Sequence, residues 1–248
     1  MRPLILNALH FRSSEQKYLE EVALHSMGEH LADPLLHIVQ DTHNPDKCRL
    51  IAGKILGKYA PKSLESHLFS VIRREIDRAY FYFYHGHTIQ KQVPEHDLSI
   101  LRNALLTGYQ SIIDFIIQLL GSAGSLEESE ILSQTLRSSN RKIRAQAIES
   151  LEKTCPPRLF TLLEPLIDER APEEKLHHYL KSGGIPLNLT QLLDRLSSSA
   201  SRADQIISLA MKAQLKTPDW RSLLKTKLAG NEEIFHHFAT ELLESHYA

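Results

Sequence analysis

Apolar side chains recur at three- and four-residue steps along almost the whole chain, and no stretch alternates apolar and polar residues as a half-buried strand would. The segment 63–90 is the clearest case. Eight apolar residues trace one helical face, whereas Arg73, Arg74 and Asp77 fall off that face. The eight are Leu64, Leu68, Val71, Ile72, Ile76, Ala79, Tyr80 and Phe83. The pattern predicts an all-α protein with a long amphipathic helix in this segment.

Helix boundaries are marked by capping side chains and by prolines. A capping residue stands before a proline at three places, and Ser125 with Glu128 has the spacing of a capping box. These signals and the remaining prolines and glycines divide the chain into about eleven helices, mostly of roughly ten to sixteen residues, with short joins that favour antiparallel neighbours. The capped starts are Asp33 before Pro34, Asn44 before Pro45 and Thr217 before Pro218, and the breaks are Pro61, Pro94, Pro156, Pro172 and 183–186.

A repeat appears when the first segments are laid over one another. Residues 3–6 correspond to 34–36 and residues 23–28 correspond to 52–57, an offset of about 30 residues that suits one short helix pair. A small residue followed four positions later by a large one returns in the segment 144–151, which is the spacing that closely stacked helices need. We therefore expect one α-solenoid domain over residues 1–248, with a hinge near 182–186.

Several segments also carry a family resemblance. They resemble HEAT repeats of the short kind found in phycobilisome-lyase-like proteins, and more specifically the HEAT-repeat regions attached to bacterial nucleotide-translocase-like and major-facilitator-like membrane proteins. The resemblance covers roughly residues 3–168 and becomes weaker beyond them, where 235–239 replaces an expected arginine–alanine step. The residues that carry it are 101–105, Tyr109, 119–121, 136–138, Arg141, 144–151 and 163–168.

The resemblance implies a stack of antiparallel helix pairs that acts as a regulatory or assembly module. Its partner would be a membrane transporter-like domain, on the same polypeptide or on a separate subunit, and the module would lie in the cytoplasm at the inner face of the inner membrane. The first repeat starts within two residues of Met1, and its apolar helix has no polar capping layer in front of it. We therefore expect the chain to be part of a longer protein.

The composition and the net charge of the chain limit the classes of function that we expect. The chain has 29 lysines and arginines against 30 acidic residues and a formal charge of -1, which argues against a surface built throughout to neutralise phosphates. Its two cysteines have no CxxC partner, which favours a reducing compartment. Its apolar runs are far shorter than the roughly 20 residues of a membrane span, so no direct span is expected.

Motifs for catalysis are missing from the sequence. It contains no nucleophile elbow, no P-loop and no HExxH, and the histidine pairs lack the spacing of metal ligands. We therefore expect no enzyme activity, no cofactor and no metal. Both the cysteines and the paired carboxylates fit packing or solvated helix ends.

Two arginine clusters and one aromatic run are the candidate binding residues. The aromatic run 80–84 places rings on all sides of a helix, so that Tyr82 and Tyr84 either hydrogen-bond at the edge of the core or anchor a docked partner. The arginines either form solvated, ion-paired faces or line a groove for a phosphate-bearing partner. These arginines are Arg73, Arg74 and Arg78 in one cluster and Arg141 and Arg144 in the other.

Three functions follow from these alternatives. The leading hypothesis is a non-catalytic module that binds a protein partner along one face of a helical array. The alternative is a nucleic-acid- or nucleotide-binding array that uses the arginines, and the third is an enzyme of the lyase or glycosylase kind. One concave surface with both arginine clusters around the tyrosines would favour nucleic acid, whereas scattered, ion-paired arginines would favour the protein-binding module.

Overall fold

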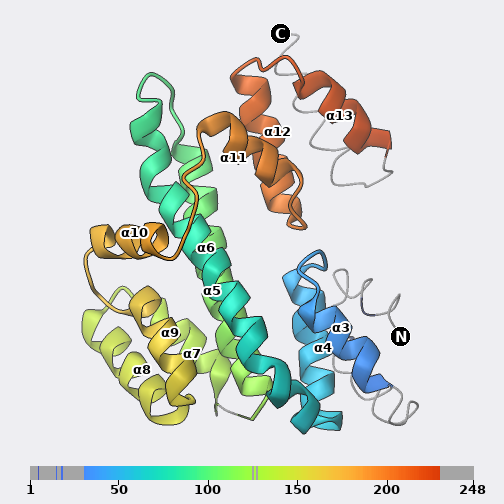
Figure 1. Ribbon diagram of the computed structural model, residues 1–248, viewed down its shortest axis with the longest axis vertical. Coiled ribbons are helices and arrows are strands. Elements are labelled where there is room, and N and C mark those ends of the chain that lie inside the picture. The colour runs from blue at the N-terminus through green and yellow to red at the C-terminus, as the bar shows by residue number, and fades with distance from the viewer. Residues whose placement is uncertain are drawn as a thin grey trace. The chain divides into compact units, whose positions relative to one another are not determined.

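A computed structural model describes residues 31–124, 126 and 128–229 of the chain, together with the single positions Ile5, Glu15 and Tyr18 (Figure 1). In this part of the chain every regular element is a helix and no strand occurs, which confirms the all-α prediction. The helices are α3 (Ala32–Gln40), α4 (Asp46–Tyr59), α5 (Pro61–Gln92), α6 (Ser99–Ser122), α7 (Ser129–Leu136), α8 (Arg141–Thr154), α9 (Pro157–Ile167), α10 (Pro172–Lys181), α11 (Leu189–Ser197), α12 (Arg202–Gln214) and α13 (Trp220–Ala229).

The chain separates into two compact units. The first contains the described residues up to Tyr84 and those from Thr107 to Gly184, and the second contains 85–106 and the described residues from Ile185 onward. Both α5 and α6 therefore contribute to both units. The second break between the units, after Gly184, falls in the segment 182–186.

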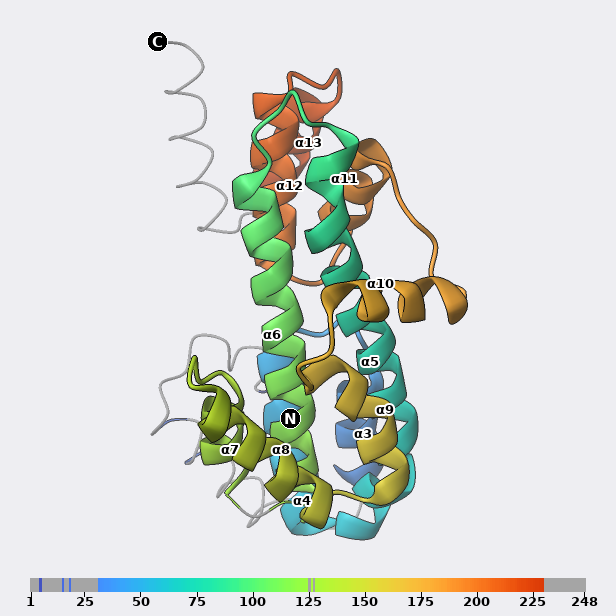
Figure 2. The same ribbon diagram turned by 90° about the vertical axis from the view of Figure 1, so that its left-hand side faces the viewer.

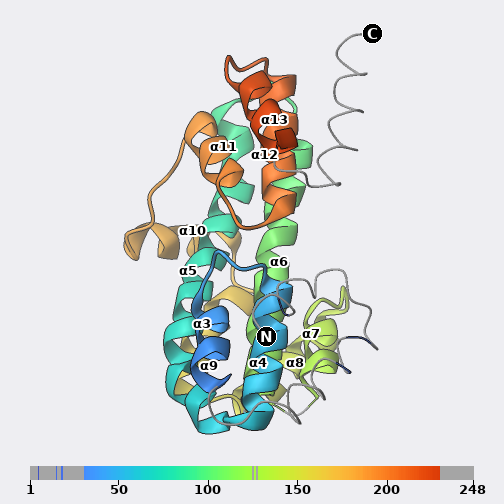
Figure 3. The same ribbon diagram turned by 90° about the vertical axis from the view of Figure 1, so that its right-hand side faces the viewer.

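In the first unit, α5 and α6 form a central layer. Helices α3 and α4 lie on one side of this layer, and α7, α8 and α9 lie on the other (Figures 1, 2 and 3). Helix α4 approaches α6 closely at Gly57, where a Cβ atom would lie 1.9 Å from the carbonyl oxygen of Ser122. Glycine at this position lets the two helix backbones meet.

Helix α5 has the amphipathic pattern that its sequence predicts. Every apolar residue on the expected face is buried, and Arg73, Arg74 and Asp77 are exposed. Its 32 residues agree with the long helix expected in this segment, since Gly86 is the only glycine or proline between Pro61 and Pro94. Helix α6, with 24 residues, is longer than the roughly ten to sixteen residues expected of most helices. At Gly86, Leu105 and Leu106 of α6 occupy the space that a side chain would need, so close packing compensates for the glycine.

Two of the predicted capping residues, Asp33 and Asn44, are wrong, although the helix breaks near them are right. Helix α3 begins at Ala32, so Asp33 lies inside its first turn, and the Asn44 side chain donates hydrogen bonds to Ile38 and Asp41 instead of capping α4. Helix α7 begins only at Ser129, and Ser125 of the predicted capping box lies outside the described residues, as do 3–4, 6, 23–28 and 235–239. The side chains that do cap helices are Asn140, Asn188 and Ser201.

The second unit is built around α11, α12 and α13, which pack on one another in sequence order. Its core joins Leu209 and Ala213 of α12 to Trp220 and Leu224 of α13. The Lys212 ammonium bridges the segments on either side of α12, at 2.5 Å from a carboxylate oxygen of Asp194 and of Asp219. This ion triad ties α11 to the start of α13.

Helix α6 is the one described helix whose length and apolar composition would suffice for a membrane span. Half of the qualifying window is buried inside the protein. Its Asp114 accepts a hydrogen bond from Ser133, and its Phe115 ring lies beneath the Arg49 guanidinium, 4.6 Å from the ring centroid. In the first unit α6 is thus a core helix with neighbours on two sides.

Candidate functional site

The predicted arginines of α5 have different surroundings. Arg78 is half-buried and forms ion pairs with Asp46 at 2.7 Å and with Glu75 at 2.6 Å. Arg73 and Arg74 are exposed and have no hydrogen-bond or ion-pair partner among the described residues. Of the three predicted arginines on α5, Arg73 and Arg74 are therefore the two whose guanidiniums no described side chain neutralises.

Beneath Arg78 lies a buried ion network that the sequence analysis did not anticipate. Arg49 of α4 is fully buried and donates to Glu75 at 2.5 Å, to Asp46 at 2.9 Å and to the carbonyl oxygen of Val39 at 3.0 Å. Glu75 is also fully buried, and its second oxygen accepts from Arg78. Two cations alternate with two anions, so the network is neutral and holds α3, α4 and α5 together.

The charges and hydrogen bonds of this network lower the pKa of the Asp46 carboxyl. Its burial alone would raise its pKa, but hydrogen bonds from Arg78 and the charges of Arg78 and Arg49 outweigh burial and hold the pKa below the ordinary value of 3.8. Asp46 is therefore ionised throughout the neutral and mildly acidic range.

This lowered pKa predicts a pH-dependent contribution to stability. A pKa that is lower in the folded than in the unfolded chain gives stability that is present above the unfolded value and is lost as the pH falls through the folded one. We expect Asp46→Asn to be less stable than the wild type at pH 7, and the difference to shrink below about pH 4. Urea unfolding at several pH values measures it, with Asp33→Asn on the exposed side of α3 as control. A difference that is constant with pH would contradict the assignment.

A hollow of about 530 Å³ lies between the end of α3 and the middle of α5. It combines an apolar surface with positive charge, since the Phe69 side chain is 43% exposed there beside Arg73 and Arg74. We call it the basic hollow. It is lined by Gln40, Phe69, Ser70, Arg73, Arg74 and Asp77.

The second arginine cluster lies elsewhere and is paired. Arg141 and Arg144 of α8 both contact Glu169, the latter at 2.6 Å, and Arg144 also donates to the carbonyl oxygen of Ser138 at 3.0 Å. The hydrogen bond from Arg144 lowers the pKa of Glu169. Since α8 and the basic hollow lie on opposite sides of the α5–α6 layer, the two clusters do not line one surface (Figures 1 and 3).

The aromatic run of α5 belongs to the core of the first unit. Phe83 meets Tyr109 edge-on at 5.2 Å between ring centroids, and Tyr80 stacks on His178 of α10 at 4.6 Å. Tyr84 is half-buried against Tyr179 of α10, at 4.6 Å between ring centroids. Helix α10 therefore covers part of the run.

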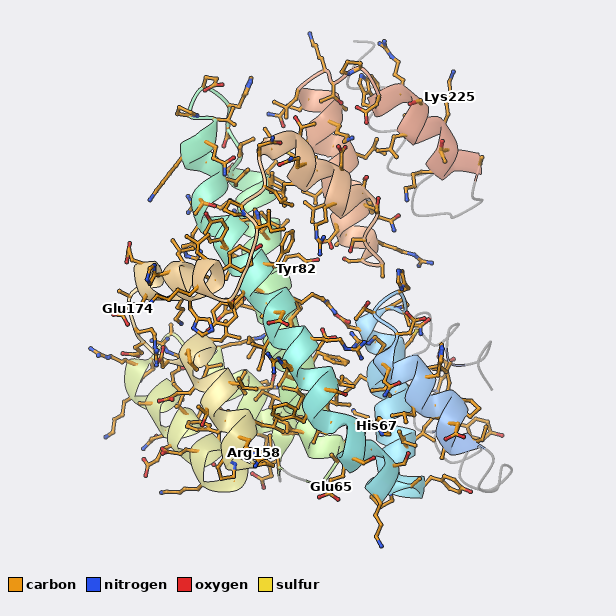
Figure 4. The ribbon with its side chains drawn as sticks, viewed as in Figure 1. Glu65, His67, Tyr82, Arg158, Glu174 and Lys225 are labelled. Atoms are coloured by element: carbon orange, nitrogen blue, oxygen red, sulfur yellow. The ribbon has the colours of Figure 1, made fainter. Side chains whose placement is uncertain are left out.

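Of the two alternatives for Tyr82, at the edge of the core or on a docking surface, the structure contradicts the docking surface. Its side chain is only 6% exposed and packs against Gly108 of α6, where an added Cβ would lie 2.8 Å from the ring (Figure 4). The glycine makes room for the ring, and no periodicity in α5 alone reveals this. Tyr82 does not offer a surface for a partner.

Other chemistry is sparse in the part of the chain that the structure describes. No three histidine, cysteine or acidic side chains converge there in the way that a metal ion requires. Both cysteines are buried, and burial raises the pKa of the Cys155 thiol to about 11, so this thiol stays protonated at neutral pH.

Comparisons of the chain with protein-family models, with curated proteins and with solved structures gave no significant match.

Proposed function

We propose that this protein is a non-catalytic module that binds a protein partner, and that the partner docks in the basic hollow. The observation that supports this most directly is that one hollow combines an exposed aromatic ring with two guanidiniums that have no ion-pair partner among the described residues. Arginine and aromatic residues are enriched among the side chains that dominate protein interfaces. The unpaired charges favour a partner segment that carries acidic side chains.

A nucleic-acid-binding array is less well supported. A polyanion is bound through many arginines and lysines along one face. Here Arg78, Arg141 and Arg144 are engaged by acidic side chains, and the basic hollow itself contains Asp77. The formal charge of -1 adds no long-range attraction for phosphates.

The proposal includes a HEAT-like α-solenoid of antiparallel helix pairs. It is supported by the packing of consecutive helices, α3 on α4, α7 on α8 and α11 on α12. It is also supported by a repeated buried pair, a small residue followed four positions later by leucine, at Ala52 and Leu56 and at Ala147 and Leu151. By the family resemblance, the partner is a membrane transporter-like domain and the module lies in the cytoplasm beside the inner membrane.

Reversing the charge of the basic hollow tests the proposal. We expect the double variant Arg73→Glu and Arg74→Glu to lose the partner that the wild type retains in affinity capture from the native cell, by about tenfold or more, because like charges then face the acidic segment. The matched control is Lys62→Glu with Arg158→Glu, an equal charge change at exposed positions away from the hollow (Arg158 in Figure 4). Unfolding curves verify that both variants fold.

Two results would overturn the proposal. One is loss of the partner to the same extent in the control variant, which would indicate a response to net charge. The other is recovery of nucleic acid alone, released by salt and by nuclease, which would favour the nucleic-acid-binding array.

A further inference from the structure

We infer that the occupant of the basic hollow is a helical segment that carries an apolar, an acidic and a basic side chain at four-residue spacing, and that Asp77 selects this mixed charge and rejects polyanions. This inference rests on the proposed function and specifies the chemistry of the partner.

The four-residue spacing that we infer for the occupant follows from the spacing of the side chains on α5 that line the hollow. Phe69, Arg73 and Asp77 are four residues apart in turn, so they follow one ridge of the helix at a rise of about 6 Å per step. All three line the hollow and all three are exposed. The ridge therefore presents an apolar group, a cation and an anion in that order.

The charge of the hollow is nearly balanced. Arg78 follows directly after Asp77, but Asp46 and Glu75 already pair with it, so it adds no free charge to the hollow. Arg73 and Arg74 supply two positive charges and Asp77 one negative charge, and the described structure gives none of these three side chains an ion-pair partner. The lining thus presents cations and an anion side by side, which an occupant with one acidic and one basic side chain complements in sign.

The Asp77 carboxylate, which has no ion-pair partner among the described residues, affects which charges the hollow accepts. A lysine or arginine of the partner gains a favourable contact with Asp77, whereas a phosphate or a second carboxylate at that place is repelled. Exposed charge pairs are each worth a fraction of a kcal/mol up to about 1 kcal/mol, which corresponds to a few-fold change in affinity. Asp77 therefore acts as a specificity-determining residue and contributes little to affinity as such.

Two alanine-based helical peptides and one oligonucleotide test this inference. The first peptide carries Leu, Glu and Lys at four-residue spacing, the second carries Leu, Glu and Glu, and the third probe is a single-stranded DNA. Fluorescence anisotropy at physiological salt, with protein up to about 1 mM, measures their binding to the full chain. The variants are Asp77→Asn, Asp77→Lys and the double variant Arg73→Gln with Arg74→Gln.

We expect the wild type to prefer the Leu-Glu-Lys peptide over the Leu-Glu-Glu peptide by about threefold. Asp77→Asn should abolish this preference, Asp77→Lys should reverse it, and both should bind the DNA more tightly than the wild type does. The double variant should bind neither peptide. Since all of these positions are exposed, the variants should fold as the wild type does.

Three outcomes would overturn the inference. If the wild type binds neither peptide, or if the peptide preference stays the same in all Asp77 variants, the occupant is not this mixed-charge helix; the cellular capture experiment then still decides the proposed function. If the wild type binds the DNA more tightly than either peptide, and loses it in the double variant, the hollow is a polyanion site and the proposed function fails as well.

Discussion

Replacing Glu75 with glutamine is expected to lower the free energy of unfolding by about 3–5 kcal/mol. Glu75 is fully buried and receives hydrogen bonds from both Arg49 and Arg78. The substitution keeps the shape of the side chain but removes the charge, and it directs an amide N–H group toward a guanidinium. Arg49 is then left buried with one anionic partner, Asp46, and the cost is that of a partly uncompensated buried charge.

Urea unfolding at neutral pH measures this effect. The matched control is Glu65→Gln, the same chemical change at an exposed position of the same helix (Figure 4). The control should change the free energy of unfolding by no more than about 0.5 kcal/mol. A loss below about 1 kcal/mol in Glu75→Gln would mean that Asp46 alone compensates Arg49, and the account of the network would be wrong.

The second large effect is expected for Gly57→Ala, which should destabilise the first unit by roughly 2–3 kcal/mol. An alanine in a helix interior normally stabilises the helix by about 1 kcal/mol relative to glycine. Here the new Cβ atom would lie 1.9 Å from the carbonyl oxygen of Ser122, which belongs to a backbone and has no rotamer to change. Helices α4 and α6 would have to separate, and the packing between them would be lost.

Gly53→Ala provides the comparison, one helical turn away on α4. Its Cβ atom would lie 2.7 Å from the Cδ1 methyl group of Leu119, the far end of a flexible side chain. We expect this variant to stay within about 1 kcal/mol of the wild type, because the gain in helix propensity offsets the shift of Leu119. Thermal unfolding of both variants measures the contrast. Equal destabilisation of the two variants would contradict the interpretation that the backbone of Ser122 cannot move aside whereas the Leu119 side chain can.

The local pattern of the sequence was sufficient to predict the helices, but it was insufficient to predict which residues cap them. The face of α5 that becomes buried follows from a period of 3.6 residues, which needs no knowledge of the neighbours. Capping depends on the exact residue at which the helix starts. Asn44 has a capping side chain, yet it donates to the backbone of α3 six residues earlier, so the conformation of the turn after α3 determines its partner.

The candidate site, too, could be predicted from the sequence only in part. The sequence indicated that Arg73 and Arg74 would be exposed, because their helical positions lie off the apolar face. Ion pairing of these arginines was one of the two alternatives that the sequence left open, and Glu75 is three residues from Arg78 on the same helix. The second partner of Arg78, Asp46, could not be predicted, since it is 32 residues away on another helix. Phe69 and Gln40 were missed for a related reason: a hollow between two helices has no signature within either of them.

The sequence by itself determined that this chain is all-α, where most of its helices break and which face of α5 is buried, because these properties depend on periodicity and on residues a few positions apart. Only the tertiary structure decided which charges are free. A buried ion network and a binding hollow both depend on side chains from different helices, and such distances are fixed by packing, which a single sequence does not specify. Tyr82 illustrates the point, since its burial depends on a glycine in α6.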